Sequence, residues 1–128
     1  MITEDYCSYE VAKLLKEKGF DSPCIGRYSV RSKEFHLDCT KLCNNGGLFE
    51  YAAPTLQMTM KWLREEHYCH IIIDYTFTAD ANLSDEYVSY CYKVENARTY
   101  IQYTHNEWYN TYEKAVEAAI KYCLENLI

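Results

Sequence analysis

The sequence predicts a single two-layer α+β domain over residues 1–128, with three helices on an antiparallel sheet of about five to six strands. Two patterns lead to this fold class. Three segments repeat apolar residues at helical spacing, and short segments between them alternate apolar and polar residues as strands do. Most strand segments are joined by short turns, a connection that only antiparallel neighbours allow. The predicted order of elements is α-β-β-(β)-α-β-β-β-α, and the length of 128 residues suits one domain.

The first helix is predicted over residues 8–19. Ser8 is a good N-cap, and Gly19 is a good stop after the last turn. Three apolar residues follow helical spacing on one face: Val11, Leu14 and Leu15. Phe20 is expected to fold back against the end of this helix.

A β-hairpin is predicted over 27–30 and 35–38, with the turn at residues 32 and 33. In this register apolar residues face each other inward and opposite charges face each other outward: Val30 with Phe35, Tyr28 with Leu37, Arg31 with Glu34, and Arg27 with Asp38. The sequence Asn-Asn-Gly-Gly at 44–47 then predicts a loop, and 48–51 a short edge strand.

The second helix is predicted at about 54–67, with Pro54 at its first position, where the ring presets the helical φ. Its apolar stripe is expected to contain Leu56, Met60, Leu63 and His67, widened by Met58 and Trp62.

Residues 69–77 are predicted to form a central strand, because Ile71, Ile72 and Ile73 are apolar on both faces. An acidic loop is expected at 78–85, followed by strands at 87–94 and 99–104. In the register expected for this hairpin, residues face each other as follows: Tyr92 with Ile101, Tyr90 with Tyr103, and Glu95 with Arg98.

The last helix is predicted to begin after Asn110 as its N-cap, with Glu113 three residues on, as in a capping box. Its apolar residues form one continuous face: Tyr112, Ala115, Val116, Ala119, Ile120, Cys123, Leu124 and Leu127.

Tyrosine is the unusual residue type, with 14 among 128 residues. Leu, Ile, Val and Phe together number 27, so the core must also recruit Tyr, Met, Trp, Cys and Ala. Because each Tyr hydroxyl needs a partner or water, many of the rings are expected at the edge of the core.

The net charge of −6 and the pI near 5.2 argue against a protein that binds duplex nucleic acid. The longest strongly apolar run, at 71–73, is far shorter than the ~20 residues of a membrane span. The first ten residues lack the pattern of a signal peptide. We therefore expect a cytoplasmic location, reduced thiols at the seven cysteines, and no cofactor.

Three segments carry a resemblance: VAKLLKEKGFDSPC at 11–24, APTLQMTMKWLREEH at 53–67, and YEKAVEAAIKYCLENLI at 112–128. Together they resemble small uncharacterised proteins encoded by gut Bacteroidales and their prophages or mobile elements. The resemblance implies a small cytoplasmic accessory protein of phage origin, and it carries over no catalytic residue.

One alternative is a zinc site, since zinc takes four Cys or His ligands in a tetrahedron. The ligands would come from His36, Cys39 and Cys43 and from His67 or His70, if the first hairpin packed beside the end of the second helix. The cysteines are spaced C-x3-C rather than in paired C-x2-C motifs, which weakens this interpretation. A zinc protein or enzyme therefore stays an alternative.

Other chemical motifs are weaker. No family signature surrounds a Cys–His pair, and Cys91 and Cys123 are expected to be buried. The opening of a calcium loop at 80–84 lacks the glycine at its sixth position, where Asp85 stands, and its closing carboxylate, where Cys91 stands.

The aromatic residues of the 87–104 hairpin lead to the functional prediction. One face of this hairpin must pack on helices, and the other is expected to show Tyr87, Tyr100 and Trp108 to solvent. Such rings on a rigid sheet bind proteins well. We therefore expect a non-catalytic interaction module that binds a protein partner or its own copy. A further alternative is a single-stranded nucleic-acid binder, although acidic neighbours oppose it.

Overall fold

The structure is a computed structural model that describes residues 1–79 and 86–128, without the side chains of 78, 79, 86 and 87. Three helices and six antiparallel strands confirm the α+β class and the predicted order of elements. The elements are α1 (Tyr9–Glu17), β1 (Gly26–Ser29), β2 (Phe35–Leu37), β3 (Glu50–Ala52), α2 (Leu56–His67), β4 (Cys69–Ala79), β5 (Glu86–Asn96), β6 (Gln102–Thr104) and α3 (Tyr112–Asn126). Residues 80–84, which resemble the opening of a calcium loop, lie outside the described residues.

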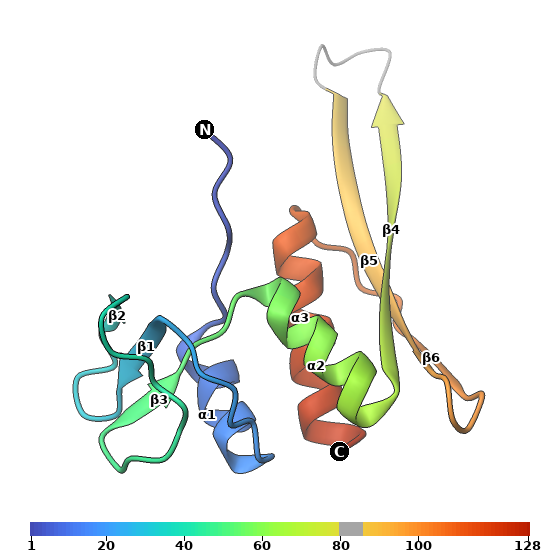
Figure 1. The fold of residues 1–128 in the computed structure, drawn as a ribbon. Coiled ribbons are helices and arrows are strands. Elements are labelled where there is room, and N and C mark those ends of the chain that lie inside the picture. The colour runs from blue at the N-terminus through green and yellow to red at the C-terminus, as the bar shows by residue number, and fades with distance from the viewer. Residues whose placement is uncertain (80–85) are drawn as a thin grey trace.

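The strands form two separate sheets rather than the one that was predicted. The first has the order β2-β1-β3 and the second the order β4-β5-β6. Figure 1 shows the helices between them, with α1 beside the first sheet and α2 and α3 beside the second. No helix among the described residues is long and apolar enough to cross a membrane.

β4 is an edge strand and not the central strand predicted from the isoleucines. β5 takes the central place, between β4 and β6. Ile71, Ile72 and Ile73 are all half-buried. Ile71 and Ile73 pack against the core, whereas Ile72 points to the opposite face because side chains alternate along a strand. A strand with apolar residues on both faces can therefore lie at the edge of its sheet, as β4 does.

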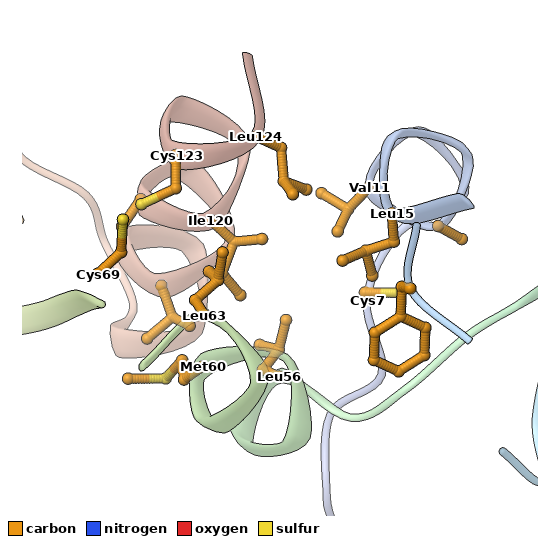
Figure 2. Packing of buried hydrophobic residues seen from close by; sticks show 14 of the residues in the cluster. Cys7, Val11, Leu15, Leu56, Met60, Leu63, Cys69, Ile120, Cys123 and Leu124 are labelled. Atoms are coloured by element: carbon orange, nitrogen blue, oxygen red, sulfur yellow. The ribbon is translucent and has the colours of Figure 1, made fainter. Parts of the chain in front are cut away.

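The helices enclose the core (Figure 2), in which α1, α2 and α3 direct buried side chains toward one another. The predicted face of α1 is confirmed, and that of α3 is confirmed except at Tyr112, which is 37% exposed. Phe20 does fold back, since its backbone N–H donates to the Leu15 carbonyl at 2.9 Å. On α2 the prediction for Met58 is wrong, because its side chain is 41% exposed. Thr59 is fully buried instead, and its hydroxyl donates to the Thr55 carbonyl at 2.9 Å.

The first hairpin is shifted by two residues from the predicted register. β1 sets Tyr28 opposite Phe35 and Gly26 opposite Leu37, which leaves residues 30–33 for the turn. Lys33 alone takes a positive φ of 60°, whereas a two-residue turn favours Gly or Asn at its centre, which Ser-Lys cannot supply. A shift of two keeps every side chain on its predicted face, yet Leu37 remains 56% exposed rather than turned inward.

The second hairpin is shifted by four residues. Val94 lies opposite Tyr103 and Glu95 opposite Gln102, so none of the predicted pairs forms. The Asn96 side chain explains the shift, because its carbonyl oxygen accepts the backbone N–H groups of Arg98 and Thr99, both at 2.9 Å. This Asx turn moves the chain reversal to residues 97–100.

Two helix starts differ by one or two residues from the predictions. Thr55 caps α2 by accepting the backbone N–H of Met58, so Pro54 precedes the cap. Thr111, and not Asn110, caps α3 by accepting the backbone N–H of Lys114 at 3.1 Å, so no capping box forms. The edge strand predicted at 48–51 is present as β3, slightly later in the chain.

The cap assignment predicts a difference between neighbouring substitutions. Thr111→Ala removes the oxygen that accepts the Lys114 N–H, and should lower the free energy of unfolding by about 1 kcal/mol. Asn110→Ala is the matched control and should change it by less than about 0.3 kcal/mol. Urea titration followed by circular dichroism measures both, and equal losses would contradict the assignment.

Candidate binding surface

The longest feature of the molecule is the ladder between β4 and β5. The two strands, of 11 residues each, pair along their whole length from Cys69–Asn96 to Ala79–Glu86. Figure 1 shows that this ladder continues well past the ends of α2 and α3. We call the outer part the arm, comprising residues 74–79 of β4 and 86–91 of β5. It meets a helix at Tyr90, whose ring lies 6.1 Å from that of Tyr112 at the start of α3, between centroids.

One face of the ladder changes from core to surface along its length. At the base, Val94 is fully buried opposite Ile71, and Tyr92 lies opposite Ile73. Because side chains alternate, the same face continues into the arm with Tyr75 and Phe77 on β4. These two rings are 72% and 55% exposed. We call the four side chains of this stretch the arm face: Tyr75 and Phe77, which are exposed, and Val88 and Tyr90, which are half-buried.

At the base of the ladder, tyrosines complete the core. The Tyr92 ring lies 5.0 Å from His105, 6.3 Å from Tyr109 and 6.4 Å from Tyr122, measured between ring centroids. Burial, with Tyr109 nearby, raises the pKa of Tyr92 above its usual value, so its phenol stays neutral. This cluster joins β5 to α3. These tyrosines therefore fill a core that is poor in aliphatic residues, whereas Tyr75, farther along the same face, is exposed.

The two long edges of the ladder differ. β6 pairs with β5 at residues 93–95, and Tyr109 pairs with Tyr90 through backbone hydrogen bonds of 2.7 and 2.8 Å. The outer edge of β4 pairs with no strand among the described residues. An open, apolar edge strand is a ready template for another strand, and most proteins avoid one by using charges, proline or bulges. Between residues 71 and 77, the only charged side chain is that of Asp74.

The three residues that the sequence predicted for binding do not lie together on the arm face. Tyr100 is 88% exposed in the β5–β6 turn, where it lines a surface cavity of about 500 Å³ with His70 and Glu95. Trp108 is 52% exposed and precedes the Tyr109 bridge to the middle of β5. These two positions are roughly 20 Å apart along the strand. The side chain of Tyr87 lies outside the described part of the chain.

The sequence analysis missed Tyr75 and Phe77, although the signal was present. Apolar residues alternate from Ile71 through Ile73 to these two rings, which places all four on one face. What the pattern could not supply was the point at which the helices stop covering that face.

The residues of the predicted zinc site lie in different environments. His36 and Cys39 are exposed at the first sheet, whereas His67 packs on Trp62, 4.6 Å between ring centroids, at the end of α2. Helices separate these two regions in Figure 1. His70 lies opposite Glu95 in the β4–β5 ladder. Within 1–79 and 86–128, no three His, Cys, Asp or Glu side chains group in a way that could hold a metal ion.

The core also contains a pair of thiols. Figure 2 shows the sulfur atoms of Cys69 and Cys123 pointing toward each other, and both side chains are buried. The hydrogen bond with Cys69 and burial raise the pKa of Cys123, which stays protonated. Cys123 is buried as predicted, and Cys91 on β5 is half-buried.

Comparisons of the chain with protein-family models, curated proteins and solved structures found no match. The resemblance of three segments to Bacteroidales and prophage proteins therefore stays a prediction. The site has to be judged on its geometry alone.

If the arm face is a binding surface rather than part of the core, its rings should contribute little to stability. Tyr75→Thr and Phe77→Thr keep a β-forming residue and should each change the free energy of unfolding by less than about 1 kcal/mol. Tyr92→Ala at the base should cost about 3 kcal/mol or more. Urea unfolding at protein concentrations low enough for the chain to be monomeric measures all three, because association would itself add to the stability. A loss at Tyr75 as large as that at Tyr92 would show that its ring is structural.

Proposed function

We propose that the chain is a non-catalytic interaction module that pairs with a second copy of itself along the outer edge of β4. The observation that carries the proposal is the exposed arm face beside an unpaired strand edge. The added strand would satisfy the backbone groups of that edge, and the rings would supply apolar contact. A cytoplasmic location, as expected from the sequence, is part of this proposal.

The sequence of β4 suits antiparallel pairing with itself. In a two-fold register centred on Tyr75, that ring lies beside its own copy and Ile73 lies beside Phe77 of the second copy. Both arm faces then lie on the same side and form one continuous apolar surface. On the opposite side, Asp74 lies beside Thr76 of the second copy. A register centred on residue 74 would instead set two aspartates against each other.

Pairing also removes a weakness of the arm. An isolated two-stranded hairpin is marginally stable in water, and sheets of three or more strands hold much better. Two arms joined at β4 form a four-stranded sheet, flanked in each copy by β6 at the base. Two-fold dimers are the commonest symmetric assemblies, and each side chain is used twice in them. A substitution on the arm face therefore acts twice in one interface.

This pairing predicts a dimer that a charge at its centre disrupts. Tyr75→Lys places two ammonium groups beside each other, and should weaken the dimer at least about a hundredfold. Tyr100→Lys is the matched control, because Tyr100 is an equally large and exposed ring at the far end of β5. Sedimentation equilibrium over a range of concentrations measures both, beside the unchanged chain.

Two results would contradict this proposal. One is an unchanged chain that remains monomeric at hundreds of micromolar. The other is a dimer that Tyr100→Lys weakens more than Tyr75→Lys does, which would move the interface to the predicted surface around the β5–β6 turn.

The salt dependence of the dimer distinguishes an apolar interface from one held by opposite charges. Each chain carries a net charge of −6, so two copies repel each other in dilute salt. Raising NaCl from about 50 to 500 mM should leave the dissociation constant of the dimer unchanged or lower it a few-fold. Binding to single-stranded nucleic acid would weaken steeply over the same range. A dimer that dissociates as salt rises would count against an apolar interface.

A further inference from the structure

Two cysteines far apart in the sequence lie directly opposite each other in the backbone. Cys24 and Cys43 form an isolated antiparallel bridge, in which Cys24 N–H donates to the Cys43 carbonyl at 2.8 Å and Cys43 N–H donates back at 2.9 Å. Residues that exchange both hydrogen bonds have Cα atoms about 5.5 Å apart, with side chains on the same side. Cysteines joined by a disulfide have Cα atoms about 4.4–6.8 Å apart. The backbone thus holds the two Cα atoms within the range that a disulfide spans.

We propose that Cys24 and Cys43 form a reversible disulfide when the protein meets a peroxide. The two thiols differ in access, since Cys24 is buried and Cys43 is half-buried. Burial raises the pKa of Cys24 to about 11, with Cys43 nearby contributing to the rise. Cys43 is therefore the thiol that an oxidant reaches first, and Cys24 is the thiol placed to resolve the product.

The chemistry balances with hydrogen peroxide as the only co-reactant. The Cys43 sulfur, as its thiolate, attacks one peroxide oxygen, so that an S–O bond forms, the O–O bond breaks and the departing hydroxide leaves as water. Cys24 then attacks the sulfur of the sulfenic acid, the S–O bond breaks, and the Cys24 proton leaves with the hydroxyl group as a second water. Two thiols lose two electrons and the peroxide gains them. A small thiol such as glutathione reverses the bond by exchange.

The other cysteines are less well placed for this reaction. Cys39 is exposed and only four residues before Cys43, but its backbone is not part of the bridge. Cys69 at the start of β4 and Cys123 on α3 face each other in the core, where both are buried and a solvent-borne oxidant has no exposed sulfur to meet. Position and access together therefore favour the pair at 24 and 43.

The Cys24–Cys43 disulfide would link the loop around Lys41 and Cys43 covalently to the chain just before β1. This loop covers the buried side chain of Arg27. The Arg27 side chain donates to the Lys41 carbonyl, two residues before Cys43, and to Glu50 at 3.3 Å on β3. Arg27 is 6% exposed. A disulfide from 24 to 43 closes a loop that contains the whole β1–β2 hairpin, and it restricts the unfolded chain. Oxidation should raise the melting temperature by about 10 °C, and dithiothreitol should abolish the rise.

Trypsin allows a direct test, because it places Cys24, Cys39 and Cys43 in three different peptides. Cys24 falls in peptide 19–27, Cys39 in 34–41 and Cys43 in 42–61, while Cys7 and Cys123 fall in 1–13 and 122–128. Reduced, folded protein is treated with hydrogen peroxide in small molar excess, alkylated, digested and analysed by mass spectrometry. The expected product is peptide 19–27 linked to 42–61, which dithiothreitol separates.

Matched variants make the outcome decisive and independent of any association through the arm. Cys43→Ser should abolish the link and the rise in melting temperature, whereas Cys39→Ser should leave both unchanged. Circular dichroism confirms that the variants are folded. The proposal is overturned if peptide 34–41 or 1–13 takes the place of either partner, if peptide 122–128 is linked instead, or if peroxide leaves Cys43 free to be alkylated.

Discussion

The apolar face of α3 is the interaction on which the rest of the structure depends. The strands of the first sheet are only three or four residues long, and the second sheet packs against α2 and α3. α3 packs against α1 on one side and against α2, β4 and β5 on the other. It therefore joins two sheets that share no hydrogen bond. Ile120, Cys123 and Leu124 are fully buried in this contact (Figure 2).

The length of this helical layer also determines where the ladder becomes exposed. The β4–β5 ladder is longer than the helices that cover its base, so one alternating pattern is core at Val94 and surface at Tyr75. The change from buried to exposed side chains requires no special residues. It requires only that the strands continue past the helices that cover them. The free edge of β4 lies beside the same exposed rings. Our functional proposal rests on this coincidence of an apolar face with an unpaired edge.

The sequence predicted best what depends on local spacing. The face of α3, the Ser8 cap of α1 and the return of Phe20 follow from neighbours in the chain, and the structure confirms them. The registers of both hairpins were wrong because side-chain bonds at the turns, such as those accepted by Asn96, compete with the pairing of apolar residues. A rule that pairs apolar residues across two strands contains no information about hydrogen bonds made by side chains in the turn.

The sequence also did not predict which residues far apart in the chain lie next to each other. Nothing near Cys24 in the sequence indicates that Cys43 lies opposite it, and nothing near Ile72 shows that, among the described residues, no strand pairs with the outer side of β4. The abundance of tyrosine did predict rings both in the core and at its edge. It could not separate Tyr92, which is buried, from Tyr75, which is not, because both stand on strands with the same alternation.

The most direct test of the account is the contact between two copies across β4. Ile73 and Phe77 are four residues apart on one strand, about 13 Å, which is too far for a nuclear Overhauser effect within a chain. In a sample that mixes isotope-labelled and unlabelled protein, filtered spectra report only contacts between copies. The account predicts cross-peaks from the Ile73 methyl groups to the Phe77 ring. Cross-peaks that involve Tyr100 or Trp108 instead, or none at concentrations where the protein is dimeric, would contradict it.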